Sequence, residues 1–490
     1  MRKFMIKTSS FALSALMLVT LLVGCTSQKD KGKNDAGTTV ELSFLAVNDL
    51  HGKFMDTENQ PGVDEFTTYL KKLYEDDKRE EILLSSGDMW QGTVESSSNQ
   101  GKLMTEWMNE VGFVSMTLGN HEYDWGAAVL SPNSELAEFP FLAINVTENG
   151  KEVNYCQAST IVEKAGVKIG IIGAIGDCLS SISGDFTDGL KFATGSALTS
   201  LVKSEARRLR TDEGCDFIVY SIHDGGSGFN SSGINSVKNK DMEWYDSALS
   251  DGYVDLVFEG HSHQGYILKD EYGVYHLQGG GENKYISCAD VSFNTNTNEY
   301  TVKPKLISSA LYASSRLTGD PVVEEIYNKY FSENDPYTTV LGKNKSKKNS
   351  GTICEQVAEL YYSKGIEVWG DKYDIVLGGG YLKTRNPYDL AAGDVTYADL
   401  FSLLPFDNEI VLGKIKGEDL RERFISKTDN YHSYPYLGWY DVEEDKDYYI
   451  VVDSYTSTYR PNKITEVARL GSGTYARDLL AEYVSKGNWA

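Results

Sequence analysis

Short apolar runs, each ending in a cluster of polar residues, recur along the first two thirds of the chain. The five clearest runs, each followed by a stretch with helical spacing, are Leu42–Val47, Ile82–Leu84, Phe113–Leu118, Phe217–Ile222 and Val254–Phe258. Near-continuous apolar runs flanked by helices are typical of strands that are buried on both faces of a sheet. The pattern therefore predicts an α/β (or α+β) domain, which we place at residues 40–315.

The polar cluster after each run contains side chains that can bind metal ions. The clusters are Asn48–Gly52, Ser86–Asp88, Gly119–Asp124, His223–Gly226 and Glu259–His263. They contain five of the seven histidines of the chain. Ligands in open α/β sheets bind beyond the carboxyl ends of the strands, so we expect these clusters to converge on one edge. A lone histidine is more often an ordinary core or surface residue, but five at successive strand ends are not explained in that way.

The donor atoms in the clusters indicate which ions fit. Imidazole nitrogen occurs together with carboxylate and amide oxygen, and no cysteine lies in the clusters. This set favours Mn, Zn, Fe or Co over a structural thiolate zinc site, and the histidines argue against Ca or Mg alone. Two ions roughly 3.5–4 Å apart can activate water and neutralise the charge of a phosphoryl group.

Single positions within the clusters suggest separate roles. Asp88 is isolated from other acids in its loop, which makes it the natural carboxylate to bridge two ions. Adjacent side chains diverge in a turn, so Asn120 can bind metal while His121 faces the substrate. Asp124 is expected to hold the His121 imidazolium and raise its pKa, which would suit His121 to stabilise the leaving oxygen.

The order and spacing of these motifs resemble a known enzyme family. The motifs are DLH at 49–51, GD at 87–88, GNHEYD at 119–124, His223, and GHSH at 260–263. They resemble the calcineurin-like metallophosphoesterases, and specifically the bacterial 5′-nucleotidase family, which includes UDP-sugar hydrolases and 2′,3′-cyclic-nucleotide phosphodiesterases. The resemblance extends from about Val40 to Trp489. It implies a four-layer αββα catalytic sandwich that holds two divalent metal ions.

The resemblance also implies a role for individual residues. The ligands implied for one ion are Asp49, His51, Asp88 and His263. Those implied for the other ion are Asp88, Asn120, His223 and His261. His121 and Asp124 would form the catalytic dyad of an active hydrolase.

A second, smaller α/β domain is expected at residues 336–490. Before it, Asp320–Glu333 has apolar residues at helical spacing and predicts a helix, within a linker that we place at residues 316–335. The domain resembles the substrate-binding domain of the 5′-nucleotidase family. Its segment Leu377–Ile415 is similar to the family's glycine-rich and Leu-Pro-Phe signature.

The three consecutive glycines of this segment allow two interpretations. Gly378, Gly379 and Gly380 either let the backbone approach a ligand closely or form a turn at the end of a strand. On the first interpretation, Gly379 and Gly380 are substrate-binding residues. The neighbouring sequence departs from the family, because Leu382 stands where the family has Arg. We expect the nearby Arg385 to supply the missing charge, with Lys383 as a second candidate.

Aromatic residues predict how a base would be held. Phe406 matches the family position that stacks on the nucleobase. Tyr455 is our candidate for the opposite wall, and the aromatic residues of segment 434–440 are alternatives, unless they form a packed surface loop. Stacking on aromatic side chains contributes about 1–3 kcal/mol per base and tolerates different bases.

The net charge of the chain limits the classes of partner that we expect. Asp and Glu number 71 against 47 Lys and Arg, so the formal charge is −24. Such an excess of acid argues against polymeric nucleic acid bound through its phosphates. A nucleotide or another small phosphate ester, recognised locally, stays compatible with it. We expect a monomer.

The first residues predict a targeting signal. Basic residues precede the apolar stretch Phe11–Val23, as in a secretory signal, and this stretch is shorter than the roughly 20 residues that span a membrane. Leu22–Cys25 resembles a bacterial lipobox, which implies cleavage of residues 1–24 and lipidation of Cys25. An ordinary secretory signal is the alternative. Residues 25–39 are polar and predict a flexible tether. We therefore expect an extracytoplasmic protein that a lipid anchors to the cell membrane.

The remaining cysteines do not form a recognisable framework. They are odd in number and contain no Cys-x-x-Cys pair, so we expect buried free thiols. They are Cys156, Cys178, Cys215, Cys288 and Cys354.

Three functional hypotheses follow. The first is an extracellular dinuclear-metal phosphoesterase that hydrolyses nucleotide phosphomonoesters with metal-activated water. The second keeps the chemistry but changes the substrate to cyclic nucleotides, UDP-sugars or esters without a base. The third is a lipoprotein that captures a solute without catalysis, which leaves the five strand-end histidines unexplained.

Overall fold

The structure is a computed structural model that describes residues 38–55, 61–75, 79–236, 251–314, 317–331, 336–385, 389–426, 430–458, 463–471 and 473–489. The predicted signal segment, Cys25 and the predicted tether up to residue 37 lie outside the described residues. Among the described helices, none combines the length and the apolar character needed to cross a membrane.

A six-stranded mixed sheet contains the first three predicted strands. Its order is β16-β15-β1-β2-β3-β4, with β1 to β4 parallel and β15 and β16 antiparallel. The bounds are β1 Thr39–Val47, β2 Glu80–Ser85, β3 Ser115–Thr117, β4 Phe141–Leu142, β15 Tyr285–Asn294 and β16 Tyr300–Ser308.

A seven-stranded sheet contains the other two predicted strands. Its order is β11-β13-β14-β12-β10-β8-β7, and the central strands β14, β12, β10 and β8 are parallel. The bounds are β7 Ser159–Lys164, β8 Val167–Ile175, β10 Phe217–His223, β11 Ile234–Ser236, β12 Leu256–Phe258, β13 Gly265–Lys269 and β14 Tyr275–Gly279. A small sheet of β5 Val146–Glu148, β6 Lys151–Glu152 and β9 Leu190–Phe192 lies outside it.

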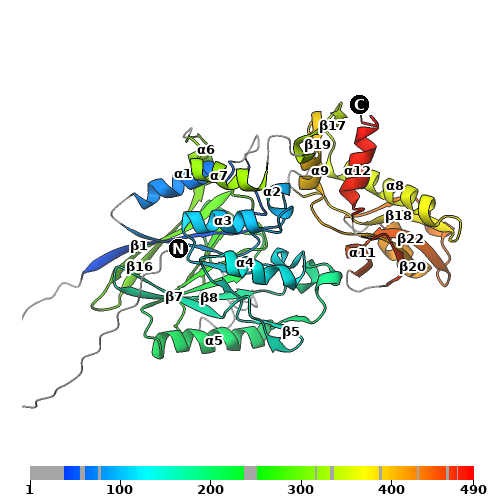
Figure 1. Cartoon of the computed structure of the whole chain (residues 1–490). Coiled ribbons are helices and arrows are strands. Elements are labelled where there is room, and N and C mark those ends of the chain that lie inside the picture. The colour runs from blue at the N-terminus through cyan, green and yellow to red at the C-terminus, as the bar shows by residue number, and fades with distance from the viewer. Residues whose placement is uncertain are drawn as a thin grey trace, which may run out of the picture. The chain divides into compact units, whose positions relative to one another are not determined.

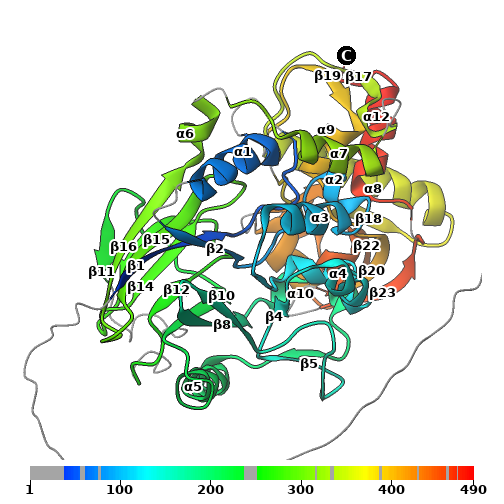
Figure 2. The ribbon, with the colours of Figure 1, turned by 60° about the vertical axis from the view of Figure 1, so that its left-hand side comes forward.

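The two large sheets pack face to face and helices cover their outer faces (Figures 1 and 2). Alternate residues of β1 show why: Phe44 faces the core between the sheets, whereas Leu45 faces the core under the helices. Helices α1 Val63–Tyr74, α3 Lys102–Val111 and α7 Pro321–Tyr330 lie on the first sheet, and α5 Gly195–Thr211 lies on the second. Short helices α2 Val94–Ser97, α4 Leu130–Leu136 and α6 Ser309–Ser314 complete this part. The predicted αββα sandwich is confirmed.

Helix α7 is the helix expected over Asp320–Glu333. The Asp320 side chain accepts a hydrogen bond from the Val322 N–H at its start, and Pro321 occupies the first turn. Val323 and Ile326 are buried in the core that also contains the α1 and α3 side chains. The helix therefore packs as part of the sandwich.

The smaller domain is built on a five-stranded mixed sheet of order β21-β18-β22-β20-β23. The strands are β18 Ile375–Tyr381, β20 Ile410–Lys416, β21 Tyr431–Tyr434, β22 Asp447–Asp453 and β23 Ile464–Arg469, and a separate pair is β17 Val340–Asn344 with β19 Gly393–Thr396. Its helices are α8 Ser350–Trp369, α9 Tyr397–Leu403, α10 Gly417–Leu420, α11 Ser454–Thr458 and α12 Ala476–Ser485. The α8, α9 and α12 side chains share one core with the sheet.

The three consecutive glycines lie within β18, which contradicts one of the two interpretations, the turn at a strand end. A Cβ on Gly378 would lie 2.2 Å from the Tyr362 nitrogen of α8. A Cβ on Gly379 would lie 2.2 Å from the His432 oxygen of β21, and one on Gly380 would lie 2.6 Å from Thr456 Oγ1. The glycines therefore let a helix, a strand and a side chain pack directly against the β18 backbone.

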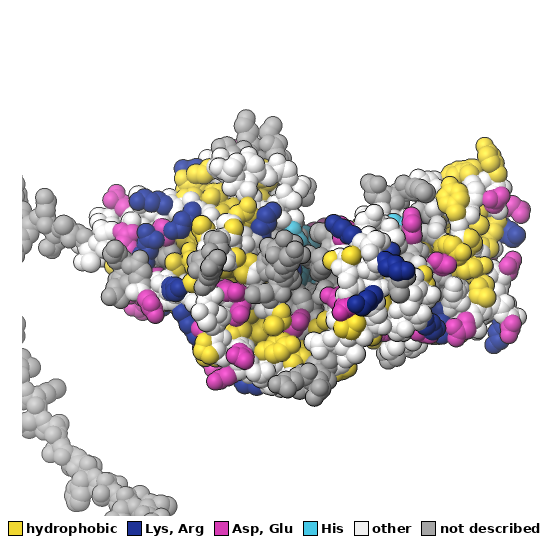
Figure 3. All heavy atoms as spheres, turned by 90° about the horizontal axis from the view of Figure 1, so that it is seen from above, with side chains coloured by type: hydrophobic (Ala, Val, Ile, Leu, Met, Phe, Trp, Pro, Cys, Tyr) yellow, Lys and Arg dark blue, Asp and Glu magenta, His cyan; other side chains and the backbone are white. Residues whose placement is uncertain are grey.

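The five cysteines within the described residues are free thiols, as predicted. Four are buried, and Cys156 is partly buried. On the face drawn in Figure 3, acidic and basic side chains are both spread over the surface, among patches of hydrophobic side chains.

Candidate metal centre and active site

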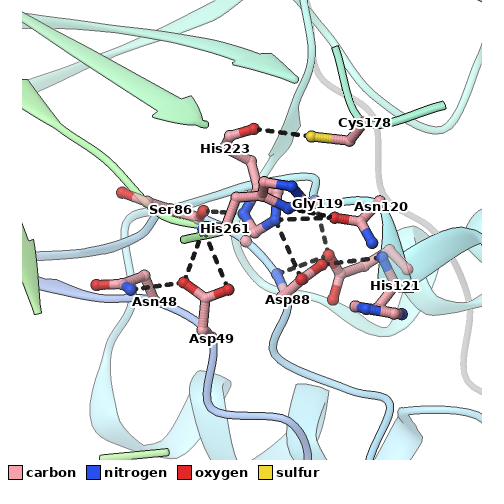
Figure 4. A network of polar contacts seen from close by, with 12 residues as sticks. Asn48, Asp49, Ser86, Asp88, Gly119, Asn120, His121, Cys178, His223 and His261 are labelled. Carbon is pink, nitrogen blue, oxygen red and sulfur yellow. Dashed lines mark hydrogen bonds and ion pairs between the residues drawn. The ribbon is translucent and has the colours of Figure 1, made fainter. Parts of the chain in front are cut away.

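The five polar clusters converge, and they do so from two sheets rather than from one. The loops after β1, β2 and β3 come from the six-stranded sheet, and those after β10 and β12 come from the seven-stranded sheet. Figure 4 shows side chains from all five loops directed toward one another. Five of the converging residues have φ between 51° and 67°: Asp49, His51, Asp88, His261 and His263.

Asp49, His51 and His263 form the first group of possible ligands. The Nε2 atoms of His51 and His263 are 3.0 Å apart, and His263 Nε2 lies 3.3 Å from Asp49 Oδ1. Ligand atoms that surround one ion at about 2.0–2.2 Å are necessarily separated by roughly 3 Å or more. The three atoms are therefore spaced as ligands of a common ion are.

Asp88, His223 and His261 form the second group. His223 Nε2 is 3.1 Å from Asp88 Oδ2 and 3.2 Å from the amide oxygen of Asn120. His261 Nδ1 lies 3.0 Å from the same Asn120 oxygen. The structure thus brings Asn120 to this group, where its oxygen is available as a fourth ligand.

The histidine tautomers suit metal binding. His51 Nδ1 is 2.9 Å from the Gln91 carbonyl oxygen, and His223 Nδ1 is 2.7 Å from that of Ser86. Because a carbonyl only accepts, each Nδ1 carries the proton, and each Nε2 can direct its lone pair at the site. In His223 that nitrogen faces two oxygen acceptors, which requires a cation or a second proton between them. The residues present therefore fit two divalent ions.

Local charges set the protonation of these histidines. Burial together with the nearby Arg385 and His263 lowers the pKa of His51, and burial with the charge of His223 lowers the pKa of His261 to about 4. Burial opposes protonation of His223, but Asp88 outweighs it and raises the His223 pKa to about 10. A metal ion would displace that proton.

Asp88 lies between the two groups. Its Oδ2 is 3.1 Å from His223 Nε2 and 3.9 Å from His51 Nε2, so one carboxylate oxygen reaches both. Burial opposes ionisation, yet the surrounding histidines hold the Asp88 pKa well below its usual range. Burial also disfavours ionisation of Asp49, but the nearby His263 has the larger effect and lowers the Asp49 pKa to about 2. Both carboxylates are therefore ionised and available to ions.

His121 and Asp124 lie together beside the two groups. His121 opens the 3₁₀ turn His121–Tyr123, and its Nδ1 is 2.7 Å from Asp124 Oδ2. The His121 backbone N–H donates to Asp88 Oδ1 over 2.9 Å, which fixes the turn to the metal ligands. Burial disfavours the imidazolium, but Asp124 and Asp88 raise the His121 pKa above its ordinary value. The pair is arranged to hold a proton at His121.

Glu122 has a structural role that the sequence reading did not assign, although it lies in the GNHEYD motif. Its buried carboxylate accepts backbone N–H groups of Asp88 at 2.9 Å, Met89 at 2.8 Å and Gly119 at 2.7 Å. One side chain thereby joins the loop after β2 to the loop after β3. The GNHEYD motif was the signal for Glu122, but two of its partners, Asp88 and Met89, are distant in sequence.

A cavity of about 260 Å³ adjoins His121 and is lined by residues of both domains. Arg385, Phe406 and Tyr455, which the sequence singled out, all line it, as does Lys383. Arg385 Nη2 lies 3.0 Å from His121 Nε2, and its guanidinium lies over the Phe406 ring at 5.4 Å. The candidate positive charge and the candidate stacking ring therefore lie next to the dyad.

Other predicted substrate residues lie elsewhere. Gly379 and Gly380 are absent from the residues that line the cavity, where Tyr381 and Leu382 form the wall instead. In segment 434–440, Tyr436 and Tyr440 are 66% and 95% exposed, and neither lines the cavity. Of the aromatic alternatives, only Tyr455 lies in the described cavity wall.

Two known domain families match the chain. Residues 42–265 match the calcineurin-like phosphoesterases, and residues 345–465 match the C-terminal domain of 5′-nucleotidases. The first range contains the five converging loops, and the second contains the cavity residues Arg385 and Phe406.

Relatives with both parts are similar over most of the chain. Protein UshA of Yersinia enterocolitica is 24% identical over 87% of this chain and 82% of the relative. A 5′-nucleotidase of Vibrio vulnificus is 25% identical over 86% of this chain and 80% of the relative. The crystal structure of a 5′-nucleotidase precursor from Thermus thermophilus has the same fold, with a TM-score of 0.67 at 16% identity over 91% of this chain and 96% of that one. The chain therefore belongs to the 5′-nucleotidase family and is a metal-dependent phosphoesterase with a calcineurin-like and a 5′-nucleotidase C-terminal domain.

Proposed function

We propose that this protein hydrolyses the phosphomonoester of nucleotides as an extracellular 5′-nucleotidase with two divalent ions. The observation that carries the proposal is the placement of Asp88 between two Asp/His groups, beside a dyad that faces the cavity. Asp49, His51, Asp88 and His263 would hold one ion, and Asp88, Asn120, His223 and His261 the other. Mn, Zn, Co and Fe are candidates because the donors are nitrogen and oxygen.

The chain's own residues support each part of the reaction. Two bound ions supply an activated water and neutralise phosphoryl charge. The carboxylate of Asp124 holds the His121 imidazole at 2.7 Å and keeps a proton on it. His121 Nε2 faces the cavity side and accepts from Arg385, so the proton that Asp124 holds lies on Nδ1. In the imidazolium form, with Arg385 on a phosphoryl oxygen, the second proton, on Nε2, is the one that His121 would give to the leaving oxygen. Arg385, beside this nitrogen, is placed to bind a phosphoryl oxygen.

The side chains that line the cavity suit a nucleotide. Phe406 and Tyr455 supply aromatic surface, and Arg385 and Lys383 supply positive charge near the dyad. Two relatives that share this architecture are described as 5′-nucleotidases.

A different substrate is the second candidate, and Leu382 is the observation that favours it. This buried apolar side chain lines the cavity where the family resemblance expects Arg. The changed wall is compatible with a 2′,3′-cyclic nucleotide, a UDP-sugar or an ester without a base. All of these substrates require attack of water at phosphorus, but they differ in the bond that breaks as well as in the group that fills the cavity.

One experiment tests the reaction and the substrate together. The purified protein is stripped with EDTA and reconstituted with Mn, Co or Zn, and kcat/KM is compared for AMP, 2′,3′-cyclic AMP, UDP-glucose and a simple phosphate ester. We expect no hydrolysis without metal, recovery on reconstitution, and a preference for AMP. Full activity of the stripped protein contradicts the metal assignment, and binding of AMP without turnover favours solute capture.

We further propose that the protein is a monomer held at the outer side of the cell membrane by a lipid on Cys25. The lipobox-like segment and the polar residues that follow it support this location. The membrane contact would be made by the lipid alone. Polymeric nucleic acid is not a proposed partner, because the net charge of −24 disfavours it.

A further inference from the structure

Strand β14 contains none of the predicted ligands, yet its carboxyl end contacts three of the loops that do. These contacts are made by the Gln278 side chain and by the backbone of Gly279 and Gly280. We propose that Gln278 is a positioning residue that fixes the geometry of the metal centre. The inference rests on the proposed metal sites, and it extends them to a strand that no motif marks.

The orientation of the Gln278 amide follows from a buried chain of hydrogen bonds. The Glu259 carboxylate can only accept, so the Tyr266 hydroxyl donates to it, and His276 Nδ1 donates over 2.8 Å. With its proton used, the Tyr266 oxygen accepts from Gln278 Nε2 over 3.0 Å. The Gln278 oxygen must then point away from Tyr266. These side chains are at most 1% exposed, so water does not compete for these hydrogen bonds.

The Gln278 oxygen points at the loop that contains His261 and His263. It accepts the backbone N–H of Gln264 over 2.9 Å, and it lies 3.0 Å from the Ser262 hydroxyl, whose single proton it shares with the Gly226 oxygen. Ser262 separates the two histidines, and both of these have left-handed φ values of 67° and 54°. Such values are unfavourable for side chains with a Cβ, so the loop needs fixed contacts to keep them. Gln278 supplies two of these contacts at once.

Ser262 and Tyr266 also contact the loop that follows His223. The Ser262 hydroxyl also lies 2.7 Å from the Gly226 oxygen, and the Gly226 N–H donates to the Tyr266 hydroxyl over 2.8 Å. A Cβ on the neighbouring Gly225 would lie 2.1 Å from Gln278 Nε2. The loop therefore approaches Gln278 as closely as a glycine permits.

The carboxyl end of β14 also contacts the loop after β1, which contains the proposed ligands Asp49 and His51. Asn48 Oδ1 accepts the Gly279 N–H over 2.9 Å, and Asn48 Nδ2 donates to the Gly280 oxygen. The same amide donates to Asp49 Oδ2 over 2.6 Å, a contact drawn in Figure 4. One strand end is thereby connected to ligands of both proposed ions.

The test compares metal binding with stability in the full chain. Gln278→Met keeps the side-chain length and removes both polar atoms. Because partners that orient metal ligands typically contribute 10–100-fold in metal affinity, we expect Mn²⁺ and Co²⁺ to bind about 10–100-fold more weakly by titration calorimetry. The visible absorption of the Co²⁺ form should also change, since it reports the arrangement of the ligands. A variant with the affinity and spectrum of the wild type overturns the proposal.

A matched control separates positioning from folding. Asn133 is another buried amide of this domain, and it donates to the Gln100 and Val129 oxygens at 2.9 Å, outside the five ligand loops. Asn133→Leu should lower the Tm but leave the Co²⁺ spectrum unchanged. If it changes metal binding as much as Gln278→Met does, the effect is general and the proposal is wrong.

A second pair of variants covers the case in which Gln278→Met does not fold. Ser262→Ala removes the hydroxyl that binds Gln278, and Ser262→Thr restores one. We expect weakened Co²⁺ binding in the first and recovery in the second, and equal affinities in both contradict the proposal. A wild-type protein that binds no Co²⁺ or Mn²⁺ refutes the proposed function itself, whereas unchanged binding in every variant refutes only the role of Gln278.

Discussion

Five of the seven proposed ligands lie on residues in the left-handed region of φ. For residues with a Cβ this conformation costs about 1–2 kcal/mol each, so the surrounding hydrogen bonds must compensate it. The Asp49 oxygens accept the His261 N–H at 2.9 and 3.1 Å, and Glu122 holds the Asp88 N–H at 2.9 Å. The ligand geometry is thus built into the loops by contacts within the protein.

A variant of His121 should lose catalytic activity without losing metal. His121→Ala removes the proposed proton donor but none of the proposed ligands. We expect kcat to fall about 10²–10⁴-fold, the range of general acid–base catalysis, while metal content by elemental analysis stays at the wild-type value. His432→Ala, which changes a histidine of β21 outside the cavity wall, serves as the control and should keep its rate. A His121→Ala variant with near wild-type kcat contradicts the dyad.

At the scale of elements, β12 and the β13–β14 hairpin hold a buried charge cluster behind the metal loops. His276 on β14 lies 2.8 Å from Glu259 Oε1, after β12, and 3.5 Å from Asp270 Oδ2, in the hairpin turn. Burial lowers the His276 pKa, but the two carboxylates outweigh burial and raise it above 6.5. The sixth histidine of the domain thus joins strands instead of binding a metal.

The raised pKa of His276 predicts how stability depends on pH. The folded state binds this proton more tightly than the unfolded state, so the stabilisation is complete below pH 6.5. It is lost as the pH rises from 6.5 through the higher pKa of the folded state. The difference in free energy of unfolding between wild type and His276→Asn should therefore shrink as pH rises.

Urea unfolding from pH 6 to pH 9, with EDTA in both samples, measures this difference. EDTA removes metal binding from the comparison, and the other titrating histidines cancel because both proteins contain them. A difference that is independent of pH would show that His276 does not change its charge in this range.

At the scale of the whole molecule, the two domains supply different parts of one site. The sandwich holds the five ligand loops, and the smaller domain brings Arg385 and Phe406 to the cavity beside His121. The alternatives for the substrate differ mainly in the group that this second part would bind. The panel of esters therefore tests the smaller domain, and metal removal tests the sandwich.

The proposed location is also a property of the whole molecule. Cys25→Ser removes the proposed lipidation site and leaves the described fold untouched. Expressed from its full sequence in a bacterium, the wild-type protein should enter the detergent phase of Triton X-114, because acyl chains confer membrane affinity. The variant should stay in the aqueous phase, and Cys354→Ser should behave as the wild type does. Equal partition of wild type and Cys25→Ser refutes the anchor.

The family resemblance implied the sandwich, and local patterns in the chain were sufficient for five strands of its two large sheets and for the order of the ligands. The reason is that a buried strand needs an apolar run such as Phe217–Ile222, and a ligand such as His223 directly follows it. The same local rule placed α7, since its apolar spacing and its Asp-Pro start lie within a few residues.

Long-range packing decided the rest. Only the folded chain shows that the ligand loops meet between two sheets, that Gly378–Gly380 serve packing, and that Tyr455 rather than segment 434–440 faces the cavity. The contacts of Gln278 join residues that are far apart in sequence, and no local pattern encodes them. Short-range apolar patterns thus determined five strands and α7, and the residues that follow the runs determined the donor set. The protonation, orientation and support of each ligand depend on neighbours that only the tertiary structure brings together.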